Sequence, residues 1–191
     1  MYILTRVGIV TFTVSKLVLV VGLIMIAPFI IALVYREIES AKIIAICCVF
    51  TITPAILGYL LCRRYRHNSL SIRDGFLVVI LIFIIVSVFS SILYQLTQTT
   101  HTITDAFFES ISGFTTTGAT IISNIESIPK SLLFWRSLTQ WLGGMGLVVV
   151  IVTILPKFGV GGLRTMPIDP TGPMSEKIFP RMSENAKIIW A

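Results

Sequence analysis

The run Ser112-Gly113-Phe114-Thr115-Thr116-Thr117-Gly118-Ala119-Thr120 lies between two strongly apolar segments. It is too polar to cross a membrane and too short to form a domain, and Ile121-Ile122 follow it directly. This order predicts a re-entrant pore loop, because non-helical backbone at membrane depth is tolerated only where protein buries it or where it lines a watery path. The carbonyl groups of such a loop need a polar partner, and a dehydrated cation is one.

Potassium channels coordinate their ion with rings of backbone carbonyls, and this run aligns with the TVGYG pattern of such filters at Thr116 and Gly118. We expect Gly118 to be the most constrained residue, because turning successive carbonyls to one side needs backbone angles that a Cβ resists. The alternative is a flexible outer loop. The predicted potassium ligands are the backbone carbonyls of Thr116, Thr117, Gly118 and Ala119, and the hydroxyls of Thr115 and Thr120 are predicted to support the loop.

The residues before the run fit a short pore helix. Thr102 and Asp105 have the spacing of a weak capping box, and Gly113 is a natural helix stop. A helix from Thr104 to Gly113 would rise about 15 Å, roughly half of the hydrocarbon core. An extended return from Thr116 to Ile122 would then span about 20 Å.

Two carboxylates, Asp105 and Glu109, lie on one face of this predicted helix. One interpretation is that they attract cations at the mouth of the pore. The other is that they interact with the positive N-terminal end of the helix dipole. The sequence favours neither.

The composition is that of a membrane protein. Hydrophobic residues make up 55% of the chain, charged residues 13%, and the mean hydropathy is +0.92. Uncharged runs of about 20 residues are long enough to cross a bilayer. We therefore predict an all-α membrane protein with kinks at Pro28 and Pro54. The predicted spans are Leu17 to Tyr35, Ile43 to Cys62, Gly75 to Leu96, and Ser137 to Pro156.

Lysine and arginine residues predict the orientation, because they concentrate on the cytoplasmic side of membrane proteins. A cytoplasmic amino terminus leaves only Arg36, Lys42, Lys130 and Arg136 outside. The inner side then receives Arg6, Lys16, Arg63, Arg64, Arg66, Arg73, Lys157, Arg164, Lys177, Arg181 and Lys187. The net charge of +6 therefore needs no nucleic-acid partner, because a basic cytoplasmic face attracts anionic lipid.

A second pattern follows the threonine run: Phe134-Trp135-Arg136-Ser137-Leu138-Thr139-Gln140-Trp141-Leu142-Gly143-Gly144-Met145-Gly146, then Ile154-Leu155-Pro156 and Gly159-Val160-Gly161-Gly162. With SGFTTTGAT in front, it resembles the first pore repeat of the Trk-type potassium uptake subunits of bacteria. The TrkH/TrkG branch is more similar than the Ktr-type subunits. The resemblance covers nearly the whole chain. Members of this family carry four helix-loop-helix pore repeats in one polypeptide, of which we find one here.

The resemblance implies a potassium-channel-like architecture in three segments. These are an amino-terminal transmembrane hairpin at 1–66, the first pore repeat at 67–160, and a cytoplasmic connector with the truncated start of the next repeat at 161–191. The implied function is potassium uptake across the bacterial inner membrane, with potassium as the transported ion and no bound cofactor. The implied partners are membrane lipids, the remaining pore repeats on the same or a second polypeptide, and a cytosolic nucleotide-binding regulatory subunit like TrkA.

Other functions stay open at this point. The chain is alternatively a homotetrameric cation channel, or a non-conducting remnant of a split or truncated transporter gene. A membrane enzyme is a distant possibility, because the sequence contains no catalytic constellation.

The remaining motifs have structural interpretations. Cys47, Cys48 and Cys62 have no CxxC spacing and are expected to pack as small apolar residues. Gly143, Gly144 and Gly146 lie inside an apolar helical span, where close helix packing explains them better than a nucleotide loop. The cluster at 159–162 is expected to form a hinge or turn at the inner membrane face.

Overall fold

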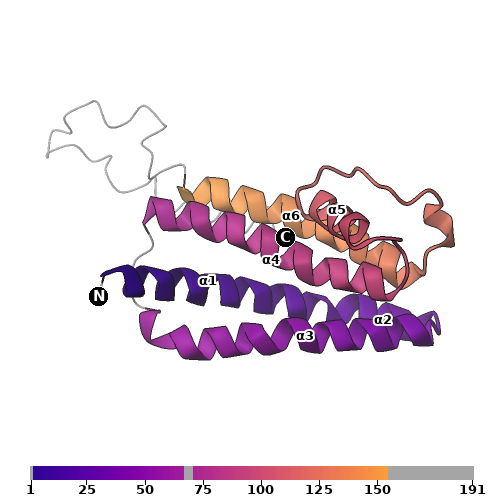
Figure 1. Ribbon diagram of the computed structural model, residues 1–191, viewed down its shortest axis with the longest axis horizontal. Helices are drawn as coiled ribbons and strands as arrows, with labels where there is room; N and C mark the ends of the chain where they lie inside the picture. Colours follow the sequence, from indigo (N-terminus) through magenta and orange to yellow (C-terminus); the bar gives the residue numbers. More distant parts are fainter. Residues whose placement is uncertain (1, 67–70, 155–191) are drawn as a thin grey trace, which may run out of the picture. The chain divides into compact units, whose positions relative to one another are not determined.

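The computed structural model describes residues 2–66 and 71–154, and these residues form helices joined by short loops, with no strand among them (Figure 1). Residues Met1–Gly144 form one unit, and of the second unit, Met145–Ala191, only the continuation of the last helix is described. The predicted all-α class is confirmed. The helices are α1 (Tyr2–Ile24), α2 (Ile26–Val34), α3 (Ile38–Cys62), α4 (Ile72–Leu96), α5 (Ile103–Phe114) and α6 (Lys130–Ile154), with 3-10 turns at Arg63–Tyr65 and Ile125–Ser127.

Within the described residues, three helical stretches are long and apolar enough to cross a membrane. They are Thr5–Val34, Ile38–Tyr65 and Arg73–Leu96, and they correspond to the first three predicted spans. The first begins earlier than the predicted Leu17, because the apolar helix continues on the amino-terminal side of the exposed Lys16. The fourth predicted span, which begins at Ser137, lies within α6 as far as Ile154, and Pro156 lies outside the described residues. So do the predicted turn at 159–162 and the connector at 161–191.

The two prolines predicted to kink their helices act differently. Proline lacks an N–H group, and its ring clashes with the carbonyl four residues earlier. For Pro28 that residue is Ile24, where α1 ends before α2 resumes at Ile26. Pro54 lies inside α3, which is continuous from Ile38 to Cys62. Only Pro28 therefore breaks its helix.

A shared apolar core joins the amino-terminal hairpin to the rest of the unit. Helix α1 packs against α3 and α4, α3 packs against α4, and α4 packs against α5. Cys47 and Cys48 are buried in this core as free thiols, which confirms their predicted packing role. The division at residue 66 stays a prediction, since the hairpin and the following helices belong to one unit.

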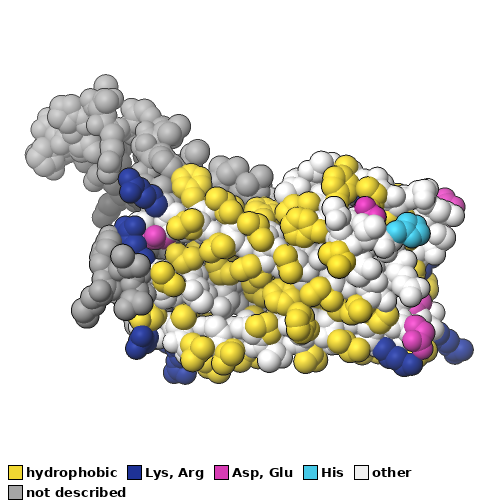
Figure 2. Space-filling view, viewed as in Figure 1, with side chains coloured by type: hydrophobic (Ala, Val, Ile, Leu, Met, Phe, Trp, Pro, Cys, Tyr) yellow, Lys and Arg dark blue, Asp and Glu magenta, His cyan; other side chains and the backbone are white. Residues whose placement is uncertain are grey.

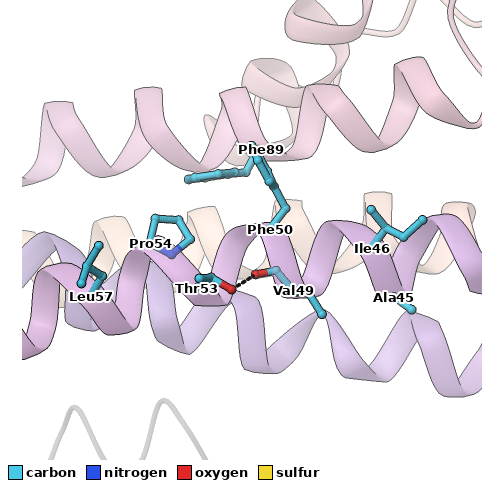
Figure 3. A pocket seen from close by; sticks show the side chains of 8 residues that line it. All are labelled: Ala45, Ile46, Val49, Phe50, Thr53, Pro54, Leu57 and Phe89. Carbon is cyan, nitrogen blue, oxygen red and sulfur yellow. Dashed lines mark hydrogen bonds between the residues drawn. The ribbon is translucent and has the colours of Figure 1, made fainter.

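An apolar groove of about 810 Å³ runs along α3 beside α4 (Figure 3). Phe50 and Phe89 meet edge to face there, with ring centroids 5.7 Å apart. The hydroxyl of Thr53 donates to the carbonyl of Val49 at 2.7 Å, so its hydrogen bond is made within α3. Apart from the Thr53 hydroxyl, the side chains that line the groove are apolar. It is lined by Ala45, Ile46, Val49, Phe50, Thr53, Pro54, Leu57 and Phe89.

Charged side chains gather at the two ends of the helices, and the flank between them is hydrophobic (Figure 2). At one end, Arg6 at the start of α1 lies 3.9 Å from Asp74 in the first turn of α4. The side chain of Ser71 caps that turn in a capping box with Asp74. The exposed arginines of the turn after α3 are Arg63, Arg64 and Arg66.

At the opposite end, Glu37 connects the hairpin to α6. This residue lies in the turn between α2 and α3, and its carboxylate accepts from the backbone N–H groups of Lys130 at 2.6 Å and Ser131 at 3.1 Å. The Ser131 hydroxyl donates to the same carboxylate at 2.6 Å. The first N–H groups of a helix have no partner within the helix, and a negative charge there is favourable. Glu37 therefore caps α6 across 93 residues of sequence.

We expect Glu37→Gln to lower the midpoint of thermal unfolding in detergent. Glutamine keeps one acceptor oxygen but loses the charge and the second acceptor, and losing a helix cap costs about 0.5 to 2 kcal/mol. The matched control is Glu39→Gln, because the side chain of Glu39 is 84% exposed and its ion-pair partner within the described residues is its neighbour Lys42. Equal losses in the two variants would show that Glu37 does not anchor α6.

Candidate ion-binding loop

The predicted pore loop follows α5, a short helix that packs against α4. Helix α5 begins after Thr102, whose hydroxyl accepts from the N–H of Asp105 at 3.1 Å, as the capping spacing indicated. Its last residues, Ser112, Gly113 and Phe114, are buried, whereas the residues from Thr115 to Thr120 are exposed. The polar backbone of this non-helical loop is thus exposed, although the membrane helices of the same unit are apolar.

The amides of the loop turn back to the carboxyl end of α5. The N–H of Thr116 donates to the carbonyl of Gly113 at 3.0 Å. The N–H groups of Thr117 and Gly118 donate to the carbonyl of Ser112, at 3.0 and 3.3 Å. In a planar trans peptide the N–H and the preceding C=O point in opposite directions. The carbonyls of Thr115, Thr116 and Thr117 are therefore turned away from α5.

The next two carbonyls of the predicted ligand set have protein donors. The carbonyl of Ala119 accepts from the Ser112 hydroxyl at 2.6 Å, and that of Gly118 accepts from Arg136 Nη2 at 3.4 Å. Thr116 and Thr117 therefore keep their carbonyls free of these contacts, and Gly118 and Ala119 do not. Ser112 and Arg136 lie close enough to donate to the carbonyls of Ala119 and Gly118, and no pattern in the sequence reveals these two donors.

Backbone angles in the loop alternate. Gly118 has a φ of +73°, which confirms the prediction that it adopts angles a Cβ resists. Thr116 has a φ of +59°, while Thr117 between them is not in the left-handed region. A β-branched residue at positive φ is a strained conformation that clusters at functional sites. The strain at Thr116 was not predicted.

Glu109 does not lie at an exposed pore mouth. Its side chain is 0% exposed, and its Oε1 accepts from Arg136 Nε at 2.6 Å. Its Oε2 accepts from the Thr120 hydroxyl at 2.9 Å and from the N–H of Ile121 at 3.2 Å. The predicted role at the mouth is wrong for this residue, because a buried carboxylate with three donors holds the loop from behind. Asp105 remains in the first turn of α5, partly exposed.

The two threonines predicted to support the loop both make hydrogen bonds with their hydroxyls. Thr115 donates to the carbonyl of Ile111 at 2.7 Å and shares a 2.9 Å hydrogen bond with Thr117. Thr120 donates to Glu109, as described above. These bonds tie both ends of the loop to α5.

Close contacts with α6 set the position of α5. A Cβ added to Gly143 would overlap the carbonyl oxygen of Phe114, and one added to Gly113 would lie 2.5 Å from the Thr139 hydroxyl. The expected close-packing role of Gly143 is confirmed. Gly113 does not stop the helix, which continues to Phe114, and it is needed instead for this approach. Trp135 of α6 also donates to the Ser90 hydroxyl of α4 at 2.8 Å.

Sequence reasoning missed Arg136 and Ser112 as functional residues. The sequence placed Arg136 among the outer charges and within the pattern that follows the threonine run, but neither observation gave it a contact with the loop. Glu109 was already predicted to lie on the pore helix. The opposite charges of Glu109 and Arg136, on two neighbouring elements of the pore repeat, were the signal that could have indicated their contact. Ser112 gave no such signal, because a serine at a helix end has many local hydrogen-bond partners.

These features define a class of membrane protein in which a short helix and a loop of carbonyls are held between two longer helices. The family model described as "TrkH: Cation transport protein" matches residues 40–191. The chain belongs to this family.

Several Trk system proteins are similar to the chain. The "Trk system potassium uptake protein TrkH" of Vibrio parahaemolyticus is 38% identical over 168 residues, which are 87% of this chain and 34% of that protein. The "Trk system potassium uptake protein TrkG" of Escherichia coli K12 is 33% identical over 193 residues, covering 97% of this chain and 38% of that protein. The chain spans about a third of the length of the curated relatives it matches.

A solved structure has a similar fold. The crystal structure of the potassium transporter TrkH from Vibrio parahaemolyticus superimposes with a TM-score of 0.76 and 34% sequence identity. The match covers 96% of this chain and 36% of that one. The helix, loop and helix arrangement described above thus belongs to a fold already known in this family.

We expect Gly143→Ala to destabilise the packing of α5 on α6, although alanine is the better helix former by about 1 kcal/mol. The added methyl group must displace the backbone of Phe114, and overpacking of this kind costs about 1 to 3 kcal/mol. Gly144→Ala is the matched control, since its Cβ would meet only Thr116 Cγ2, at an ordinary 3.6 Å. Thermal unfolding in detergent compares the two, and an equal or higher midpoint for Gly143→Ala would refute the close approach.

Proposed function

We propose that this chain takes part in potassium uptake across the bacterial inner membrane and supplies one part of a carbonyl-lined selectivity filter. The observation that carries the proposal is the set of amides from Thr116 to Gly118, which donate back to α5 and so turn the preceding carbonyls away from it. Carbonyls oriented in this way replace the hydration shell of an ion. The names of the similar proteins, which are potassium uptake proteins, agree with this role.

Within this proposal the ligands are the carbonyls of Thr116 and Thr117, and Gly118 and Ala119 contribute by shaping the loop. The partial negative charge at the carboxyl end of α5 favours a cation beside the loop. One loop supplies only part of a ring of carbonyls, so the remaining pore repeats complete the site, on the same or a second polypeptide. A cytosolic nucleotide-binding regulatory subunit like TrkA is the proposed further partner.

The proposed orientation has the amino terminus in the cytoplasm. It is supported by the basic end formed by Arg6 and the arginines after α3, which lies opposite the mixed charges around Glu37. Single cysteines in a cysteine-free background test it. An impermeant reagent added to intact cells should label position 38 and leave position 64 unlabelled, and the reverse pattern would overturn the orientation.

The central test is rubidium uptake, with and without competing sodium, after the missing repeats are supplied in frame or as a second polypeptide. We expect Gly118→Ser to lower the preference for rubidium over sodium or to abolish uptake. At a φ of +73° an ordinary residue costs on the order of 1 to 2 kcal/mol, and about 1.4 kcal/mol is a tenfold change in an equilibrium.

Thr120→Ser is the control, because it keeps the hydroxyl that donates to Glu109. It should retain most of the uptake at matched protein level. The chain expressed alone should not restore growth under potassium limitation, since an ion would be incompletely coordinated. Unchanged uptake and sodium competition in Gly118→Ser would remove this loop from the filter, and growth rescue by the chain alone would favour a homotetrameric channel.

A further inference from the structure

We propose that Glu109 and Arg136 form a charge pair that keeps the back of the filter loop electrically neutral, which makes both of them positioning residues that determine cation passage. This inference rests on the proposed function and extends it to residues outside the loop. It concerns the contact between one buried carboxylate of α5 and one guanidinium of α6, 27 positions apart in the sequence.

The geometry places both charges directly behind the loop. The Glu109 side chain is 0% exposed and that of Arg136 is 18% exposed, and the two charged groups meet at 2.6 Å. Glu109 also accepts from Thr120 and Ile121, and Arg136 reaches the carbonyl of Gly118 with Nη2. Each member of the pair therefore contacts the loop as well as its partner.

Arg136 lies so close to the loop that its positive charge affects a cation bound there. A guanidinium 3.4 Å from a loop carbonyl repels any cation that approaches the same backbone, unless an opposite charge compensates it. Among the ion pairs of the described residues, the partner of Arg136 is Glu109. Because water is excluded around Glu109, screening by solvent is weak and the compensation must come from within the protein.

The two single variants should therefore behave differently. Glu109→Gln leaves an uncompensated positive charge beside the loop, so we expect rubidium uptake to fall on the order of tenfold or more. Arg136→Gln leaves a buried carboxylate without its guanidinium, which destabilises the fold. Thr120 and Ile121 still donate to this carboxylate and no positive charge is left beside the loop, so the loss of uptake at matched protein level should be smaller. This variant also frees the Gly118 carbonyl, so competition by sodium should change.

The double variant Glu109→Gln/Arg136→Gln separates charge from packing. It removes both charges at nearly constant volume, so uptake should recover well above that of Glu109→Gln alone. If the two residues act only by filling space or by hydrogen bonding, the double variant should be at least as impaired as the worse single variant. Arg136→Lys adds a second comparison, because lysine keeps the charge but cannot contact Glu109 and Gly118 with the same planar fork.

The experiment measures rubidium uptake and sodium competition in these variants, with the remaining repeats present and the amount of protein in the membrane matched. Glu126→Gln and Lys130→Gln are controls, since both side chains are exposed charges and should leave uptake unchanged. Recovery in the double variant supports the proposal. A double variant no better than Glu109→Gln, or uptake unaffected by either single variant, overturns it.

Thermal unfolding of the same variants in detergent provides a readout that does not depend on transport. A charge pair predicts that the double variant is destabilised by less than the sum of the single variants, and simple additivity would overturn the pairing. If the wild-type protein with all repeats takes up no rubidium, the proposed function fails, while the unfolding comparison still decides whether the pair exists.

Discussion

The hydrogen bonds between the loop amides and the carboxyl end of α5 are the constraint on which the site depends. The N–H groups of three consecutive residues converge on the carbonyls of Ser112 and Gly113, and planar peptides then determine where the preceding carbonyls point. Thr116 and Gly118 have left-handed backbone angles within this segment. Without those bonds the residues from Thr115 to Thr120 would be a polar surface loop with no preferred direction for its carbonyls.

The rest of the unit keeps α5 and the loop in position. Gly143 and Gly113 allow α6 to approach the end of α5, and Glu109 fixes the far side of the loop to Arg136 on α6. Glu37 in turn binds the start of α6 to the amino-terminal hairpin. This contact makes the hairpin part of the support for the loop.

Much of this architecture was predictable from local patterns. The apolar runs indicated the membrane helices, the Thr102 cap indicated the start of α5, and the constrained backbone of Gly118 followed from its type. What escaped prediction depends on contacts between distant residues. Glu109 meets Arg136 across 27 positions and Glu37 meets Ser131 across 94, and no local pattern reveals such pairs. The direction of the Ala119 carbonyl depends in the same way on the side chain of Ser112.

The central claim, that the loop carbonyls bind the transported ion, is tested most directly by locating a heavy analogue of potassium in a structure with all repeats present. Anomalous scattering from thallium would identify the ion without relying on activity. The account predicts thallium density facing the carbonyls of Thr116 and Thr117, with the Ala119 carbonyl still bonded to Ser112. Thallium bound elsewhere along the pore, with the carbonyls of Thr116 and Thr117 bonded to protein donors, would contradict it.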